Sequence, residues 1–465
     1  MSTHSNTILV ANYFIPYPPA HGVHLRILKL LKWLHGEGYR VILVMAADSI
    51  DANALAELRK VTFAVHWTKP ALRTRIGMRF PFLRKMLWET LNLRTRIGMR
   101  FPFLRKLKRL LSDRDVGGDH LSQVHRSGLP NIGDYRVKRA LCPENLVRLV
   151  GKLARKYEAS ALIAEYVFLT PCFNALPPDT LKLVDTIGVF SQKLEQVLAW
   201  GAAAAFACSK EEERGYLLQA DAIIAIQSRE AKLLRSLVPE REVILVGMDF
   251  AVTGNEQANV GNPDSIAVIA SDNPLNIHGL RRFLAECWPQ IKAARPAATL
   301  HIVGRVGDAC QSDDQAIRYS RWIPNLAEVY KDARVIINPV IAGTGLKIKS
   351  AEALAHGKPL VAWTNGVEGL DYIGSPPYIE CRSWKEFADA VIRLLQSTDE
   401  AEKLSARALA YATEVFDVVA VYAPLKVLLE KRLNSKHSTN RQKRRLYWKK
   451  GSLLPGDKRR KRLNN

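Results

Sequence analysis

Short apolar runs alternate along this chain with longer segments that are apolar on one face only. Thr7–Phe14 is a nearly continuous apolar run, and Val23–His35 has a helical period that stops at Gly36 and Gly38. Buried strands separated by helices are typical of a parallel, doubly wound sheet. We therefore expect such a sheet near the amino terminus, continued by strand Tyr39–Ala46, helix Ala52–Lys60 and strand Val61–Trp67.

The alternation pauses over residues 70–135 and then returns in two blocks. Residues 1–250 are expected to form a first domain with 70–135 as a basic insertion, and 251–264, rich in Gly, Asn and Pro, a linker. Residues 265–410 are expected to form a second domain, followed by a helix at 411–432 and a basic, disordered tail at 433–465. The later expected strands are Ser160–Tyr166, Leu181–Asp185, Ala222–Ile226, Val243–Gly247, Ser265–Ala270, Ala298–Gly304 and Val335–Asn338. The later expected helices are Cys142–Tyr157, one opened by Ser209, Gly279–Ala293, Asn325–Lys331 and Ala401–Arg432.

The strongest local pattern is a glycine loop between a strand and a helix. Gly343, Thr344 and Gly345 follow the strand Val335–Asn338 and lead into a helical segment that ends at Gly357. Such a loop presents backbone N–H groups and the positive end of a helix dipole, which together favour an anion. Lys347 and Lys349 are unfavourable beside that dipole unless an anion binds there, and Glu352 could accept hydrogen bonds from hydroxyl groups. The pattern indicates a ligand with phosphates and hydroxyls, such as a nucleotide sugar.

With this stretch the chain resembles the family 4 retaining glycosyltransferases, which have two Rossmann-like domains facing across a cleft (the GT-B fold). Relatives carry a Pro…Gly-x-Gly-x-Lys-x-Lys-x-x-Glu-Ala-x-Ala-x-Gly-x-Pro pattern that Pro339–Pro359 reproduces. The resemblance also covers the first strand with its loop, and most of 140–430. It implies an acceptor-side first domain, a nucleotide-sugar-binding second domain and a final helix that crosses back to the first domain.

The resemblance also implies roles for single residues. Glu352 matches the acid that binds the donor's ribose hydroxyls, whereas Thr344 stands where many relatives have a second acid. The expected donor-binding residues are Gly22, Arg305, Gly343, Thr344, Gly345, Lys347, Lys349 and Glu352, with Lys347 nearer the diphosphate than Lys349.

The chain departs from its relatives after the strand Leu181–Asp185. Similar proteins often read Asp-Thr-His-Asp there, and this chain reads Asp185-Thr186-Ile187-Gly188. The usual His-Asp pair is thus replaced by Ile187 and Gly188, and no catalytic side chain is assigned. The leaving phosphate could instead take the acceptor's proton, because retaining transfer is often drawn in that way.

Metal sites and membrane spans are not expected. The six cysteines are scattered without a Cys-x-x-Cys pair, and no Asp-x-Asp occurs in a suitable loop. We therefore expect no metal and no cofactor besides the donor substrate, with the helix terminus and lysines stabilising the leaving phosphate. The absence of a disulfide framework favours a reducing cytoplasm, and no apolar run has the length of a signal peptide core or a spanning helix.

The net charge of +23 is concentrated in two segments. Residues 72–109, which include an identical 14-residue repeat (72–85 and 93–106), hold twelve Lys or Arg against Glu89, a net charge of +11. Residues 431–465 hold fourteen Lys or Arg against Asp457, a net charge of +13, so the rest is close to neutral. Basic segments that contain phenylalanines are typical of contact with anionic lipid. We expect a peripheral protein at the inner face of the plasma membrane, bound through 72–109 and 433–465.

The expected function is transfer of a sugar from a nucleotide-diphosphate sugar to a glycan or lipid-linked acceptor, in surface polysaccharide or glycoconjugate synthesis. Three alternatives remain open: a binding protein that has lost catalysis, a sugar-nucleotide epimerase of the same shape, and a nucleic-acid-binding protein. The last would explain the basic tail with Tyr447 and Trp448 but not the stretch Gly343–Glu352. Nucleic acid is therefore not the expected partner.

Overall fold

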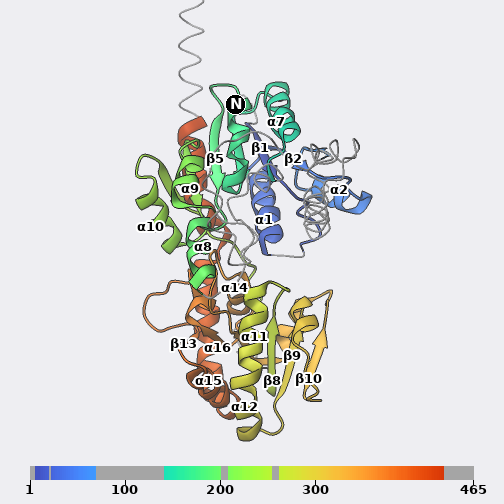
Figure 1. The fold of residues 1–465 in the computed structure, drawn as a ribbon, viewed down its shortest axis with the longest axis vertical. Helices are drawn as coiled ribbons and strands as arrows, with labels where there is room; N and C mark the ends of the chain where they lie inside the picture. Colours follow the sequence, from blue (N-terminus) through green and yellow to red (C-terminus); the bar gives the residue numbers. More distant parts are fainter. Residues whose placement is uncertain (1–5, 20–21, 70–140, 200–207, 254–260, 434–465) are drawn as a thin grey trace, which may run out of the picture. The chain divides into compact units, whose positions relative to one another are not determined.

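The structure of the protein is a computed structural model that describes residues 6–19, 22–69, 141–199, 208–253 and 261–433 (Figure 1). The chain divides into two units, Met1–Val421 and Tyr422–Asn465. The repeat segment 72–109 and the tail from 434 onward lie outside the described residues, so the expectations for them stay predictions.

Sheet A consists of seven parallel strands from the first half of the chain, in the order β3-β2-β1-β4-β5-β6-β7. On one side of β1 the strand order continues outward to β2 and β3, and on the other side it continues from β4 to β7. The order therefore reverses between β1 and β4. The strands are β1 Thr7–Asn12, β2 Arg40–Ala46, β3 Ala64–Thr68, β4 Ala161–Glu165, β5 Leu181–Asp185, β6 Ala222–Ala225 and β7 Glu242–Leu245.

Sheet B consists of six parallel strands from the second half, in the order β10-β9-β8-β11-β12-β13. The order reverses between β8 and β11. The strands are β8 Asn262–Ile269, β9 Thr299–Val303, β10 Ile317–Ser320, β11 Ala333–Asn338, β12 Leu360–Trp363 and β13 Ile379–Cys381. Two parallel-sheet α/β domains confirm the predicted fold class.

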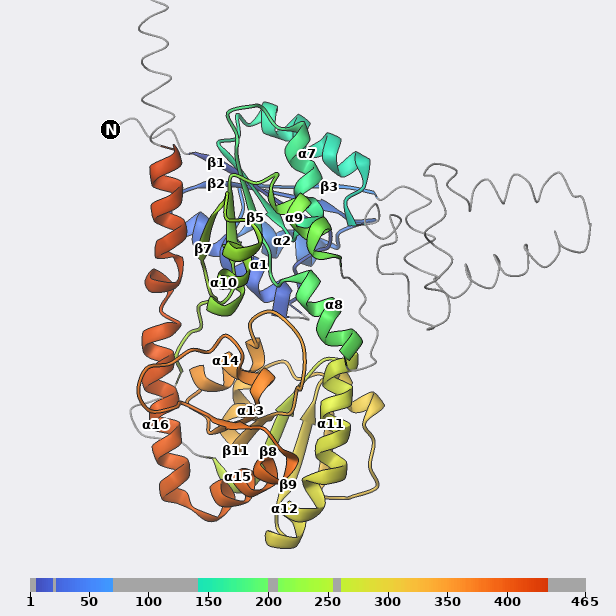
Figure 2. The ribbon, with the colours of Figure 1, turned by 60° about the vertical axis from the view of Figure 1, so that its left-hand side comes forward.

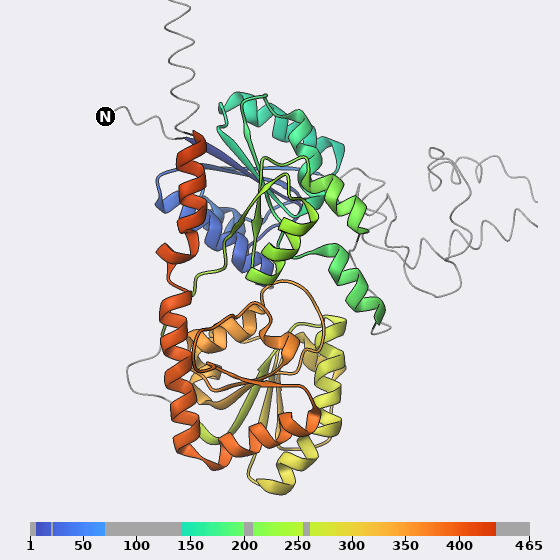
Figure 3. The ribbon, with the colours of Figure 1, turned by 90° about the vertical axis from the view of Figure 1, so that its left-hand side faces the viewer.

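Each sheet is covered on both faces, and the middle of its central strands is apolar toward both. In β8, Ile266 and Val268 face one hydrophobic cluster, and Ala267 and Ile269 face another. Helices α11 (Pro274–Glu286) and α15 (Trp384–Gln396) contribute to the first cluster, and α14 (Ile348–Ala355) and α16 (Thr398–Val415) to the second (Figure 2). In sheet A, α1 (Gly22–Gly36) and α7 (Glu144–Lys156) likewise cover opposite faces (Figure 3).

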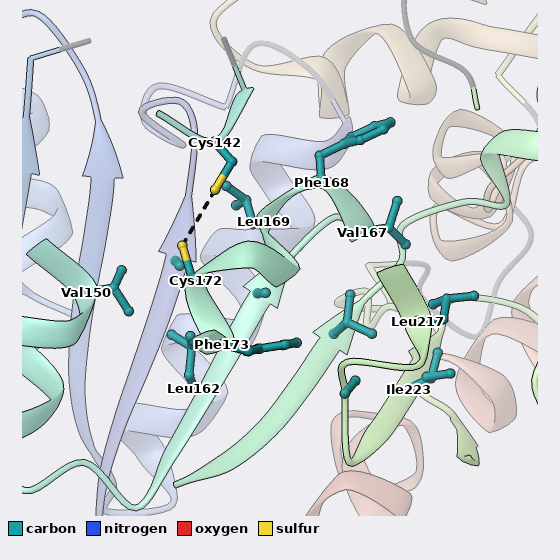
Figure 4. Packing of buried hydrophobic residues seen from close by; sticks show 14 of the residues in the cluster. Cys142, Val150, Leu162, Val167, Phe168, Leu169, Cys172, Phe173, Leu217 and Ile223 are labelled. Carbon is teal, nitrogen blue, oxygen red and sulfur yellow. Dashed lines mark hydrogen bonds between the residues drawn. The ribbon is translucent and has the colours of Figure 1, made fainter. Parts of the chain in front are cut away.

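The helices around sheet A follow the sequence pattern with few changes. Ser209 caps its helix as expected, and with Glu212 it forms a complete capping box. In the hydrophobic core under α7, Cys142 and Cys172 are buried free cysteines whose sulfur atoms lie 3.8 Å apart (Figure 4). The elements are α1 Gly22–Gly36, α2 Ala52–Arg59, α7 Glu144–Lys156, η1 Val167–Ala175, α8 Phe190–Ala199, α9 Lys210–Leu217 and α10 Ser228–Leu237.

Around sheet B, two expected helices differ from the prediction. The helix expected at Gly279–Ala293 is two helices that meet at Cys287, since Pro289 interrupts the backbone hydrogen bonding. The helix expected at Ala401–Arg432 is interrupted at Phe416, and residues 418–433 are helical again. The elements are α11 Pro274–Glu286, α12 Trp288–Ala294, η2 Arg305–Ala309, α13 Leu326–Asp332, α14 Ile348–Ala355, η3 Thr364–Val367, α15 Trp384–Gln396 and α16 Thr398–Val415.

Candidate functional site

The topology places the glycine loop at a position where ligands bind in such sheets. In doubly wound sheets, ligands bind beyond the carboxyl ends of the strands where the strand order reverses. In sheet B that point lies between β8 and β11, and the loop that contains Gly343–Gly345 follows β11. In sheet A it lies between β1 and β4, and Tyr13 and Tyr166 follow these two strands directly.

The glycines of the loop adopt backbone conformations that other residues rarely take. Gly343 has φ 129° and Gly345 has φ 82°, both in the region that favours glycine. These turns bring the chain from the end of β11 into α14, whose first residue is Ile348 and whose N-cap is Lys347. Lys349 therefore lies in the first turn of α14 and Glu352 in the second.

Lys347 points back into the loop. Its Nζ donates hydrogen bonds to the carbonyl oxygens of Gly343 (3.0 Å) and Gly345 (3.2 Å). Burial lowers the pKa of this ammonium to about 8, although the carboxylates of Glu368 and Glu230 oppose that shift. In this structure Lys347 holds the glycine loop closed upon itself, and it is not turned outward toward a ligand.

Glu352 and Lys349 bind each other. Lys349 Nζ lies 2.8 Å from Glu352 Oε2, which also accepts a hydrogen bond from the hydroxyl of Tyr330 at 3.1 Å. Tyr330 stacks on His356, with ring centroids 4.3 Å apart, so the acid has a rigid support. Burial is the main reason that the pKa of Tyr330 is raised, and it keeps this hydroxyl a donor. Glu352 is thus fixed on α14 while its side chain keeps partial exposure.

The two remaining predicted donor residues lie in different surroundings. Gly22 opens α1, and a Cβ built there would lie 2.4 Å from Cδ1 of Ile348, the first residue of α14. A larger residue at position 22 would therefore require the Ile348 side chain to move. Arg305 begins η2 after β9 and pairs with Asp272 at 2.8 Å, with both side chains about half exposed. No contact joins Arg305 to the glycine loop among the described residues, and the structure leaves its predicted role open.

Glu230 is a functional candidate that the sequence analysis missed. It lies in the first turn of α10, is fully buried, and its Oε1 accepts a hydrogen bond of 2.6 Å from the N–H of Gly345. Its Oε2 has no hydrogen-bond partner among the described residues. Burial raises the pKa of this carboxyl to about 7, against the opposing effects of the Gly345 N–H, Lys347 and the Val189 N–H. A carboxyl that titrates near neutrality therefore lies directly on the glycine loop.

The loop that replaces the His-Asp pair also lies against the glycine loop. Ile187 has φ 54° and Gly188 has φ 146°, so two consecutive residues adopt positive φ values. A Cβ on Gly188 would lie 3.2 Å from Thr344 Oγ1, and a Cβ on Gly345 would lie 3.2 Å from the carbonyl oxygen of Ile187. Asp185, two residues before Ile187, is fixed by a buried ion pair with Arg26 at 2.8 Å. The chain thus holds this segment in place without the usual histidine.

A cavity of about 120 Å³ opens between these loops. Its only lysine is Lys193 on α8, whose ammonium group has no hydrogen bond or ion pair with any described residue, and desolvation lowers the pKa of this group. Lys193 Nζ lies 5.9 Å from the ring centroid of Phe190. Aromatic rings dominate the walls, which are formed by Tyr13, Tyr166, Phe168, Ile187, Gly188, Phe190, Lys193 and Thr344. The cavity combines ring faces, hydroxyls and a single positive charge beside the glycine loop.

The structure therefore brings together most of the predicted site. Gly22, Thr344, Gly345 and Ile187–Gly188 meet around the loop, with Lys347, Lys349 and Glu352 at the start of α14. Tyr13 and Tyr166 could have been found from their places directly after two predicted strands. Glu230 and Lys193 carry no such signal, because only tertiary packing brings α8 and α10 to this loop.

Comparison with protein families gives one match. Residues 263–397 match the family model described as Glycosyl transferases group 1. This part of the chain is a glycosyl transferases group 1 domain. It comprises most of sheet B and includes the glycine loop and α14. A search of curated protein sequences finds no match.

Solved structures show the same fold over nearly the whole chain. Anabaena HepE in complex with UDP and glucose aligns with a TM-score of 0.59 at 13% identity, covering 92% of this chain and 100% of that one. TarM aligns with a TM-score of 0.58 at 10% identity, covering 92% and 99%. Sucrose-phosphate synthase of Thermosynechococcus elongatus aligns with a TM-score of 0.57 at 15% identity, covering 94% and 98%. At these identities the alignments establish the fold, which is that of GT-B glycosyltransferases.

Two searches of the described residues bear on the remaining expectations. None of their helices is both long enough and apolar enough to cross a membrane. No group of three or more His, Cys, Asp or Glu side chains among them could hold a metal ion.

Proposed function

We propose that this protein is a retaining glycosyltransferase of the family 4 type. It transfers a sugar from a nucleotide-diphosphate sugar to a glycan or lipid-linked acceptor in surface polysaccharide or glycoconjugate synthesis. The observation that carries the proposal is the glycine loop with Glu352 at the start of α14, inside the group 1 domain (residues 263–397). A loop of this kind binds a diphosphate through backbone N–H groups, and an acid eight residues later reaches the ribose hydroxyls.

The donor would lie across the carboxyl edge of sheet B. There the N–H groups of the glycine loop and the dipole of α14 stabilise the charge that develops on the leaving phosphate. Lys349 can turn from Glu352 toward the diphosphate, because its side chain is 39% exposed and their pairing is a single contact. These groups supply the positive charge without a metal ion, so we propose that transfer is metal-independent.

The acceptor would enter the aromatic cavity lined by Tyr13, Tyr166 and Phe190. Sugar rings stack on aromatic faces, and the tyrosine hydroxyls can orient a nucleophilic hydroxyl. Ile187 cannot accept a proton, so the leaving phosphate takes the proton of the acceptor hydroxyl as the new glycosidic bond forms. The sugar is then added on the face from which the diphosphate departs, and the anomeric configuration is retained.

The two basic segments motivate a cellular location. We propose that residues 72–109 and 433–465 hold the protein at anionic lipid on the inner face of the plasma membrane, where lipid-linked acceptors are exposed. Their charge of +11 each supports this proposal, together with the phenylalanines of the repeat.

The test of the proposed function is a panel of nucleotide sugars screened by thermal shift and calorimetry. At least one member should stabilise the wild type, and Glu352→Ala should weaken its binding by about tenfold or more, since it removes charge-assisted hydrogen bonds. Glu402→Ala, an exposed acid on α16 in the same domain, is the matched control and should bind as the wild type does. Transfer with the binding donor should persist in excess chelator.

Each alternative has its own outcome. Donor binding without transfer to any acceptor would identify a binding-only relative, and interconversion of a free sugar nucleotide would identify an epimerase. Tight RNA binding with no response to nucleotide sugars would favour a nucleic-acid-binding protein. Unchanged donor affinity in Glu352→Ala would remove this residue from the site.

A further inference from the structure

One buried carboxylate links helix α10 to the glycine loop. Glu230 Oε1 lies 2.6 Å from the N of Gly345, and Glu230 comes from the first turn of a helix that covers sheet A, not sheet B. A Cβ on Gly188 would lie 3.9 Å from the same oxygen, so the loops after β5 and β11 both pack around it.

The contact uses the group that an anionic ligand would need. The N–H of Gly345 is a donor of the loop that leads into α14, and a backbone N–H of this kind donates only one short, linear hydrogen bond at a time. A carboxylate and a phosphate oxygen therefore cannot both hold it. The two anions would also repel each other at this distance in a buried site.

The second carboxylate oxygen shows that the contact is incomplete. Glu230 Oε2 is buried and has no hydrogen bond of normal geometry with the described residues, although the Val189 N–H lies close enough to lower the pKa of this carboxyl. A buried carboxylate with one unmet oxygen is destabilising relative to one that is fully hydrogen-bonded. Such a group can be displaced at a smaller loss of free energy than a satisfied one.

We propose that Glu230 occupies the anion site of the glycine loop in the donor-free protein and releases the Gly345 N–H when the diphosphate of a donor binds. This inference rests on the proposed function, since it assigns the diphosphate of a nucleotide sugar to that loop. Glu230 is then a positioning residue. It keeps the glycine loop in its observed conformation while no donor is bound, and only an anion that binds the Gly345 N–H more strongly displaces it.

The exchange makes donor affinity depend on the charge of Glu230. The charged groups around it are Lys347 on the loop, Glu368 after η3, Arg229 on its own helix and Lys193 on α8. Arg229 pairs with Glu368 at 3.2 Å, and Lys347 is the cation that lowers the pKa of Glu230. When Glu230 is protonated it is a weaker competitor, and the donor binds more tightly.

The experiment measures the affinity of the nucleotide sugar that gives the largest thermal shift, between pH 6 and pH 8.5. The diphosphate of a nucleotide sugar keeps its charge throughout this range. Wild-type affinity should fall by roughly tenfold as the pH rises, because the competing carboxylate becomes ionised. Glu230→Gln should bind about five- to tenfold more tightly than the wild type at pH 8.5 and should show no fall in affinity between pH 6 and pH 7.5. Above pH 7.5 both proteins should weaken as Lys347, whose pKa is about 8, loses its charge.

A matched control separates this effect from the loss of any buried carboxyl. Glu165 is also fully buried in the first domain, at the end of β4, and neither of its carboxylate oxygens forms a hydrogen bond with a described residue. Glu165→Gln should keep the pH profile of the wild type. The wild-type profile itself needs no variant, so the proposal stays testable even if Glu230→Gln folds poorly.

The outcomes are distinct. A pH-independent wild type, or a Glu230→Gln variant whose affinity is unchanged or weaker, overturns the inference while donor binding still supports the proposed function. Failure of every nucleotide sugar to bind both wild type and variant overturns the proposed function, and the inference with it.

Discussion

Lys193 keeps a charged group in an aromatic cavity without an ion pair from any described residue. Burial of an unpaired ammonium lowers stability, so retention of this lysine indicates a use for its charge. An acceptor that carries a phosphate or carboxylate would supply the missing partner.

Replacement of Lys193 should therefore separate stability from activity. Lys193→Met keeps the length of the side chain and removes the charge, so the Tm should stay the same or rise while transfer to an anionic acceptor falls by about tenfold or more. Lys232→Met, an exposed lysine on α10, is the control and should change neither property. A lower Tm with unchanged transfer would assign Lys193 a purely structural role.

Glu230 should also make the stability of the fold depend on pH. Burial raises the pKa of this carboxyl from 4.5 to about 7, so between these values the folded chain binds a proton that the unfolded chain has lost. Stability falls as pH rises through such a window, here by an amount on the order of 1–3 kcal/mol. As the pH rises from 5 to 8, the Tm of Glu230→Gln should therefore increase relative to the Tm of the wild type. A Tm difference that stays constant over this range would contradict the raised pKa.

The residues of the site differ in how far the sequence could predict them. Gly343, Gly345 and Glu352 belong to one continuous pattern whose chemistry is local, and the structure places them together at the start of α14. Glu230 lies more than one hundred positions away and reads as an ordinary first-turn acid. Lys347 was expected to face the ligand, but its side chain is long enough to fold back to the carbonyl oxygens of its own loop.

At the scale of elements, the connection between β5 and α8 is the least ordinary part of the first domain. Ile187 is a β-branched residue with positive φ, and such residues are held only where the surroundings determine the backbone. Before Ile187, Asp185 forms an ion pair with Arg26 at 2.8 Å. After Ile187, the Glu213 carboxylate accepts hydrogen bonds of 2.8 Å from the N–H groups of Phe190 and Ser191. The connection is thus fixed at both ends.

Gly188→Ala tests whether this connection must have its observed shape. Alanine at φ 146° is strained, and its Cβ would lie 3.2 Å from Thr344 Oγ1, so we expect a loss of about 1–3 kcal/mol of stability and weaker donor binding. Gly215→Ala on α9 is the matched control: it has open space and no positive φ, and should gain about 0.5–1 kcal/mol. Equal effects of the two substitutions would show that the connection adapts freely.

The elements that the sequence predicted well are those with a strong apolar period and clear ends. The strands β2, β5 and β9 agree with expectation to within a residue at each end. The helix expected from Gly279 starts earlier, because Asn273 caps it and Pro274 takes its first position. The sequence did not predict β10 (Ile317–Ser320). Its four residues are too few for an alternation of exposed and buried positions that distinguishes a strand from a loop.

At the scale of the whole molecule, the distribution of charge separates two tasks. The chain outside 72–109 and 431–465 is close to neutral, and it contains both sheets and the whole candidate site. We therefore propose that the basic segments associate with a polyanion. A membrane and a nucleic acid are the two polyanions to distinguish, and the phenylalanines of the repeat favour the membrane.

Deletion of both basic segments should separate membrane association from donor binding. Each Lys or Arg near an anionic bilayer contributes on the order of 1 kcal/mol, so even a fraction of these charges would hold the protein there. The wild type should sediment with anionic liposomes but not with neutral ones, and a variant that lacks 72–106 and 433–465 should remain in the supernatant while binding the donor unchanged. High salt should weaken the wild-type association only in part, since Phe80, Phe82, Phe101 and Phe103 would insert into the interface. A wild type that ignores anionic liposomes but binds RNA tightly at moderate salt would replace the membrane with nucleic acid as the partner of these segments.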